Sequence, residues 1–211
     1  VRLFLKQPAW ALRNPKQFLE ALLTRYVEAY SQAARGDATA PEMMDTILAA
    51  CNALLSGTPA LCDYAAKTGH LAKIVTLMDN AALPRPPTAI GLVNILASSQ
   101  LCVETLAATP CAVRAVLAAL DAADDAKTVL RAVDTLDKAF AKNTCAAGGD
   151  ACLVAQLLAC DGTPRMLRVL EGAYDMRLGT DASEAKARTV AALQHATADA
   201  THGPRLRDVL D

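Results

Sequence analysis

Apolar residues recur every three or four positions along nearly the whole chain, which is the spacing of helices with one buried face. The clearest stripe includes Leu19, Leu22 and Tyr26 and predicts a long helix over residues 15–34. No segment of the sequence alternates apolar and polar residues in the way that a half-buried strand does. The pattern therefore predicts an all-α fold.

Prolines mark where many of these helices begin, because proline fits the first helical turn and often follows a capping side chain. Such pairs occur at Asn14-Pro15, Thr58-Pro59, Thr109-Pro110 and Thr163-Pro164, and less clearly at Ala40-Pro41. With the apolar spacing, they predict helices that begin near Pro15, Pro41, Pro59, His70, Pro87, Gln100, Pro110, Ala126, Asp150, Pro164, Ala182 and Pro204.

Similar segments recur about forty residues apart. Leu61-Cys62 returns forty positions later as Leu101-Cys102, and the helix predicted from His70 has the same apolar spacing as the one predicted from Pro110, also forty positions later. The helix predicted from Pro164 repeats this spacing after 54 positions, in a unit that carries an insertion. Each unit comprises two short helices and one long helix, which is typical of armadillo repeats, with HEAT repeats as the related two-helix class. We therefore predict one armadillo/HEAT-like solenoid domain over residues 1–211, with an N-terminal helical pair or partial repeat (1–57), three repeats (58–98, 99–141 and 149–200) and a C-terminal helix (201–211).

Each long helix carries one polar residue within its apolar face: Asn52, Asn94, Asp134 and Gln194. Two interpretations remain open. In armadillo proteins a matching asparagine lines a concave groove and holds an extended peptide, and the likeness implies the same role here. Alternatively, these residues satisfy helix-end carbonyls and neighbouring loops within the chain. The groove hypothesis comprises Asn52, Asn94, Arg131, Asp134, Lys138, Lys186, Gln194 and His195.

Charge and composition argue against several classes of protein. The chain has 21 Lys and Arg against 22 Asp and Glu, a net charge of −1, which disfavours a nucleic-acid binder or a polybasic membrane anchor. The longest uncharged stretch, Pro86–Val103, is too polar and too interrupted for a membrane span. We predict no direct membrane insertion and no nucleic-acid partner.

The sequence also lacks the usual signatures of a catalytic or metal centre. Cys145, Cys152 and Cys160 are spaced unlike any zinc site, and no nucleophile, base and acid set is recognisable. We therefore predict no catalytic residue, no metal and no cofactor. Seven cysteines without a CxxC pair fit reduced, buried thiols of a cytosolic protein.

Several short segments, taken in order, resemble a known family: Pro8–Leu19, Gly69–Ile74, Gln100–Val103, Met166–Gly172 and Ala185–Ala187. Together they resemble the receptor-mediated endocytosis eight family of large endosomal J-domain co-chaperones, with Ala72 where that family usually has proline. The resemblance implies a position near the C-terminal end of the parent, downstream of the J domain. The first residue, Val1, agrees with a fragment of a longer protein.

The resemblance further implies a place on the cytosolic face of early endosomes and partners in the endosomal sorting machinery, a sorting nexin and the WASH complex. Hsp70 would be contacted only through a J domain, and this chain contains no His-Pro-Asp tripeptide. We expect a non-enzymatic protein–protein interaction scaffold in endosomal sorting and membrane trafficking. The alternative is a structural spacer or self-association module with no partner groove of its own.

Overall fold

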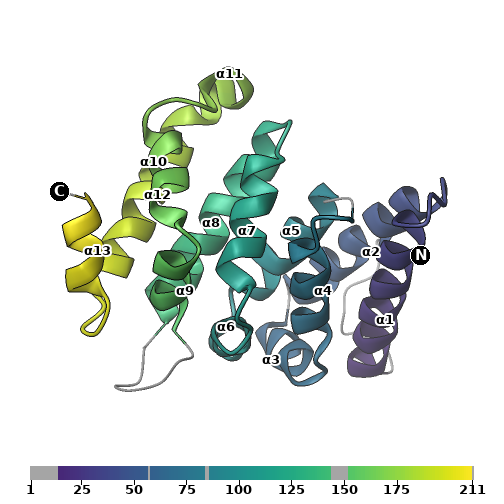
Figure 1. Ribbon diagram of the computed structural model, residues 1–211. Helices are drawn as coiled ribbons and strands as arrows, with labels where there is room; N and C mark the ends of the chain where they lie inside the picture. The colour runs from purple at the N-terminus through teal and green to yellow at the C-terminus, as the bar shows by residue number, and fades with distance from the viewer. Residues whose placement is uncertain (1–13, 57, 84–85, 144–151, 211) are drawn as a thin grey trace.

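The structure, a computed structural model, describes residues 14–56, 58–83, 86–143 and 152–210. All regular elements within these ranges are helices, which stack in a row from α1 at one end to α13 at the other (Figure 1). The predicted all-α helical-repeat fold is therefore confirmed.

The helices follow one another in groups of similar make-up. An opening pair, α1 (Pro15–Ala33) and α2 (Ala40–Leu55), precedes two groups of three: α3 (Pro59–Lys67), α4 (His70–Asp79), α5 (Pro87–Leu96), then α6 (Gln100–Ala107), α7 (Ala112–Asp121), α8 (Ala126–Lys142). The remaining elements are α9 (Leu153–Ala159), α10 (Gly162–Leu170), α11 (Asp175–Leu178), the 3₁₀ turn η3 (Gly179–Asp181), α12 (Ala182–Thr197) and α13 (Gly203–Leu210).

Side-chain caps explain several of these starts. The side chain of Asn14 accepts a hydrogen bond from the Gln17 amide, and Asp125 accepts one from the Thr128 amide at 2.9 Å. The predicted starts at Pro110 and Pro164 are wrong by two residues, because α7 begins at Ala112 and α10 begins at Gly162. The predicted start at Asp150 lies outside the described residues, as does Trp10 within the segment Pro8–Leu19.

The helices predicted to be the long ones form one row of the stack, in which α2 packs on α5, α5 on α8, and α8 on α12, although α5 has 10 residues, the same number as α4. A second row comprises α1, α4, α7 and α10, and the short helices α3 and α6 also pack together. Buried leucines, valines and alanines from both rows join into a continuous apolar core between Leu19 and Leu206. The small side chain of alanine, which makes up about a fifth of the chain, allows helices to approach closely. The exact division into repeats stays a prediction.

The third group differs from the others by an insertion, α11 and η3, that protrudes from the row between α10 and α12 (Figure 1). Buried Tyr174 anchors the insertion, since the guanidinium groups of Arg168 and Arg177 lie 5.9 and 5.8 Å from its ring centre. Arg177 also donates a hydrogen bond to the Ala123 carbonyl at 2.6 Å. Cation–π contacts of this kind favour a fixed position for the insertion.

Among the described residues, no single helix is long and apolar enough to cross a membrane, and α6 with α7 satisfy that test only as a pair bent by 95°. Cys51, Cys62, Cys102, Cys111 and Cys160 are free thiols, and burial raises the pKa of Cys51 and Cys102 to about 12. Cys152 is disulfide-bonded, so the prediction that all the cysteines are reduced is wrong at this position. The cysteine pattern therefore no longer argues for a cytosolic protein.

Candidate partner groove

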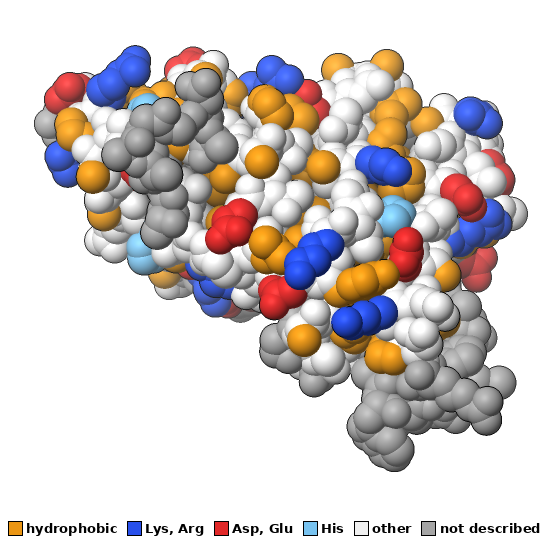
Figure 2. All heavy atoms as spheres, turned by 90° about the horizontal axis from the view of Figure 1, so that it is seen from below, with side chains coloured by type: hydrophobic (Ala, Val, Ile, Leu, Met, Phe, Trp, Pro, Cys, Tyr) orange, Lys and Arg blue, Asp and Glu red, His pale blue; other side chains and the backbone are white. Residues whose placement is uncertain are grey.

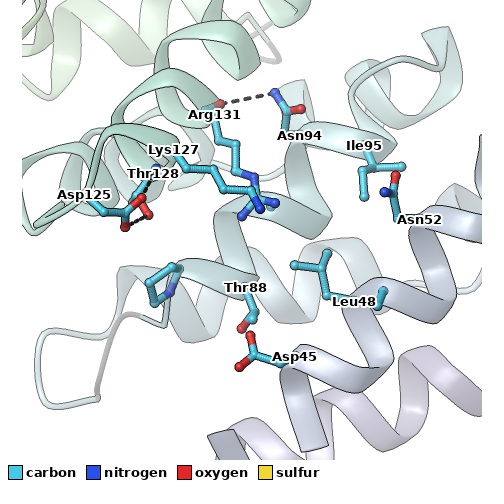
Figure 3. Close-up of a pocket in the computed structure, with 13 residues that line it drawn as sticks. Asp45, Leu48, Asn52, Thr88, Asn94, Ile95, Asp125, Lys127, Thr128 and Arg131 are labelled. Atoms are coloured by element: carbon cyan, nitrogen blue, oxygen red, sulfur yellow. Dashed lines mark hydrogen bonds between the residues drawn. The ribbon is translucent and has the colours of Figure 1, made fainter. Parts of the chain in front are cut away.

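Two adjoining hollows form a groove along the row of long helices. The first has a volume of about 540 Å³ and lies between α2, α5 and the first turns of α8 (Figure 3). The second, of about 470 Å³, extends from it toward Cys62, Ser98 and Lys138. Three residues line both hollows, Asn52, Asn94 and Ile95, so the two lie side by side.

Asn94, at the centre of this groove, bonds α5 to α8. Its Nδ2 donates to Asp134 Oδ2 at 2.9 Å, to Thr135 Oγ1 at 3.1 Å and to the Arg131 carbonyl at 3.2 Å. Its Oδ1 accepts a hydrogen bond from Lys138 Nζ at 3.3 Å. Among the four polar residues of the long helices (the polar ladder: Asn52, Asn94, Asp134 and Gln194), Asn94 thus uses its amide within the chain. Its partners lie inside α8, however, and not at a helix end or in a loop as the second interpretation expected.

Asp134 extends this network to α12. Its carboxylate forms ion pairs with Lys138 at 2.6 Å and with Arg188 at 2.9 Å. Burial raises the pKa of Asp134, but hydrogen bonds from Lys138 and Asn94 and the charge of Arg188 outweigh it and hold the pKa below its ordinary value. Asp137 adds contacts to Arg188 at 3.5 Å and to His195 at 3.6 Å. The network joins three successive long helices.

Arg131 and Asn52 differ from these residues because they present donors toward the groove. The Arg131 guanidinium extends from α8 into the first hollow (Figure 3), and no hydrogen bond or ion pair holds it within the described part of the chain. Burial lowers its pKa, partly offset by the charges of Asp125 and Asp45. Asn52 is exposed, and its Oδ1 only accepts a 3.3 Å hydrogen bond from Ser56.

Two residues of the groove hypothesis point elsewhere. Lys186 bonds to Asp175 of α11 at 2.7 Å, and Gln194 is exposed on α12. In a helix that turns about 100° per residue, Lys186 lies about 160° and Gln194 about 120° from Arg188, which is the residue that faces Asp134. Lys186 and Gln194 therefore lie on a different face of α12 from Arg188, whereas His195 lies on the face of Arg188.

Arg188 is not among the residues predicted for the groove, although the sequence contains a signal for it. Arg188 and His195 are seven residues apart, which places them on one face of a helix, and Glu184 precedes Arg188 by four residues. Taken together, these spacings point to a charged stripe toward α8. How α12 is rotated about its axis relative to α8 depends on the insertion before it. The apolar periodicity does not determine that rotation.

Other kinds of site find no support in the described ranges. No group of three or more His, Cys, Asp or Glu side chains there is placed to hold a metal ion, and Cys145 lies outside them. Figure 2 shows one face on which Lys and Arg side chains are interspersed with Asp and Glu rather than gathered into a patch. Such a surface offers no track for a phosphate backbone.

Comparison with known proteins gives one relationship. A stretch of 80 residues, 36% of this chain, is 41% identical to the DnaJ homolog subfamily C GRV2 of Arabidopsis thaliana. That stretch covers 3% of the length of the Arabidopsis protein. No protein-family profile and no solved structure matches the chain. The sequence is therefore related to a J-domain co-chaperone of subfamily C.

Proposed function

We propose that this chain is a non-enzymatic protein–protein interaction scaffold whose groove along α2, α5 and α8 binds an extended segment of a partner. The observation that carries the proposal is that two hollows lie side by side along these helices and share Asn52, Asn94 and Ile95. A groove with both apolar and polar lining suits a peptide, because side chains need apolar contacts and the backbone needs hydrogen-bond partners.

The cellular setting of this proposal rests on similarity alone. Relationship to a subfamily C DnaJ homolog agrees with a role beside Hsp70, which a J domain outside this chain would contact. The family resemblance of the sequence supports a place on the cytosolic face of early endosomes, with a sorting nexin and the WASH complex as partners. A fluorescent fusion of the full parent protein that fails to coincide with early endosomes would contradict this setting.

A groove-filling variant tests the binding function directly. Ala49 is exposed and lines the first hollow, so Ala49→Trp fills the groove without disturbing the core. Ala21, exposed on α1, gives the matched control Ala21→Trp, which adds the same surface away from the groove. Affinity capture from cytosol, followed by binding measurements with each purified candidate, compares the three proteins.

We expect a partner that binds the wild type and Ala21→Trp directly but not Ala49→Trp, with all three proteins equally stable. Direct binding that persists in Ala49→Trp would show that the groove is not the binding site. Concentration-dependent dimers in light scattering, with no direct binder, would instead favour the spacer or self-association module.

A further inference from the structure

The first hollow contains an unusual charged group, the guanidinium of Arg131. Arg114, Arg165, Arg168 and Arg188 each form an ion pair with an Asp or Glu within 4.0 Å. Arg131 forms none with any described residue, although it is only partly exposed. A guanidinium has five N–H donors in a planar fork, which suits a bidentate carboxylate.

Gly91 of α5 is the reason that the guanidinium fits where it lies. A Cβ atom built on Gly91 would lie 3.0 Å from Arg131 Nη1, 3.1 Å from Arg131 Cζ and 3.1 Å from Leu48 Cδ2. Glycine within a helix is less favourable than alanine by roughly 0.5–1 kcal/mol. Its place in the middle of α5 is explained by the close approach of Arg131 and Leu48 to the helix backbone.

The charges around Arg131 restrict what it can bind. Lys127 extends from α8 into the same hollow, and Asp45 lies on the wall formed by α2 (Figure 3). Asp125 is occupied, because its carboxylate accepts hydrogen bonds from the amide and hydroxyl of Thr128 at 2.9 and 2.6 Å. The two cations and two carboxylates that line the hollow balance in charge, so one added carboxylate meets less repulsion than a phosphate group of about −2 charge.

Asn52 supplies the second contact on the α2 side of the groove. No hydrogen bond to another described residue uses its Nδ2 donors, so they are available to a backbone carbonyl. Axes of neighbouring packed helices lie about 8–10 Å apart, a distance that about three extended residues span. A carboxylate at Arg131, over α5, and a carbonyl at Asn52, on α2, therefore lie within reach of one short extended peptide.

We propose that Arg131, whose guanidinium packs against Gly91, is the specificity-determining residue of the groove and selects an extended peptide with an Asp or Glu side chain. This inference rests on the proposed function, since it assigns the partner chemistry of the same groove. The carboxylate binds in the plane of the guanidinium, and Asn52 holds the backbone of the same peptide on the α2 side of the groove.

Selection from random peptides of about twelve residues, which span about 40 Å when extended, tests the proposal on the whole chain. Selected peptides are then measured by fluorescence polarisation against wild type, Arg131→Gln, Ala49→Trp and Arg25→Gln. Arg25 is a matched control because it lies on α1, exposed and paired with Glu28 at 2.8 Å.

We expect the selected peptides to share one acidic position, and its replacement by the amide to weaken binding to the wild type about 10- to 100-fold. In Arg131→Gln, replacing the acid of the peptide by the amide changes the affinity little. Arg131→Gln itself lowers the affinity for the acidic peptide by a similar factor, whereas Arg25→Gln binds that peptide as tightly as wild type. If the wild type prefers the acidic peptide and Arg131→Gln does not, the acidic side chain of the peptide pairs with Arg131.

Two failures have different meanings. Peptides that Ala49→Trp excludes, but that carry no shared acid or bind Arg131→Gln as tightly as wild type, overturn the role of Arg131 and leave the groove function standing. Absence of any peptide that Ala49→Trp excludes overturns the proposed function and this inference together.

Discussion

Replacing Asn94 by alanine tests whether the polar ladder holds the helices together. The change removes the hydrogen bonds that Asn94 Nδ2 donates to α8 and the one that its Oδ1 accepts from Lys138. An amide nitrogen has two hydrogens, so its three acceptors share two bonds. One of these is charge-assisted through Asp134, and such a bond contributes about 1.5–3 kcal/mol.

The partners left behind by Asn94→Ala remain satisfied. Thr135 Oγ1 still donates to the Arg131 carbonyl at 2.6 Å, and Asp134 keeps its ion pairs with Lys138 and Arg188. No group is stranded, so we expect a loss of about 2 kcal/mol in the free energy of unfolding. For a domain of this size that loss lowers the Tm by about 4–8 °C.

Asn52→Ala is the matched control, because Asn52 is the exposed asparagine of the ladder and its side chain hydrogen-bonds, among the described residues, only with Ser56, which directly follows α2. We expect its Tm to stay within about 2 °C of wild type, as for most surface changes. Differential scanning calorimetry compares the two variants under one set of conditions. Equal Tm values for Asn94→Ala, Asn52→Ala and wild type would refute the reasoning, since the network would then add nothing to stability.

Three further predictions concern the core. Tyr26→Phe removes the buried hydrogen bond of 2.9 Å to Thr88 Oγ1, so chemical denaturation should show a loss of about 1–2 kcal/mol, and an unchanged midpoint would contradict it. Gly162→Ala places a Cβ 2.5 Å from Leu157 Cδ1 and 2.6 Å from Leu117 Cδ1, and overpacking should cost about 1–3 kcal/mol, whereas a raised Tm would contradict the packing. Burial, with the nearby charge of Lys73, lowers the pKa of His70 below 6.5, so the unfolded chain binds a proton first and stability should fall as pH drops below about 6.5. His70→Gln should flatten that slope in urea unfolding, and an identical slope would count against it.

The sequence predicted the helices well where local chemistry decides them. Caps at Asn14 and Asp125 and the prolines at 15, 59 and 87 act within one turn, so a single segment contains the whole signal. The starts of α7 and α10 were misplaced because Pro110 and Pro164 are not decisive by themselves. At α10, Asp161 in the left-handed region and tightly packed Gly162 come before the proline. That packing involves Leu117 of another helix, which local spacing does not reveal.

The candidate site was predictable in part for a similar reason. Asn94 and Asp134 are 40 positions apart, which is the repeat period, so the repeat itself brings them to equivalent places on adjacent helices. Periodicity does not show that the two side chains bond to each other rather than to a partner. Periodicity also does not identify the residue of α12 that faces Asp134. That helix follows the insertion, and Arg188 rather than Gln194 faces Asp134.

The contacts divide the residues of the groove into residues for stability and residues for recognition. Asn94 and Asp134 have their polar groups paired within the chain, whereas Asn52 and Arg131 keep donors that face the groove. Alanine variants of Asn94 and Asn52, which occupy equivalent places in the sequence pattern, are therefore expected to have opposite effects on stability and on peptide affinity. Asn94→Ala should lower the Tm and change peptide affinity little, while Asn52→Ala should weaken peptide binding at an unchanged Tm. If both variants lose stability and affinity in proportion, the ladder acts as one unit and the division of roles is refuted.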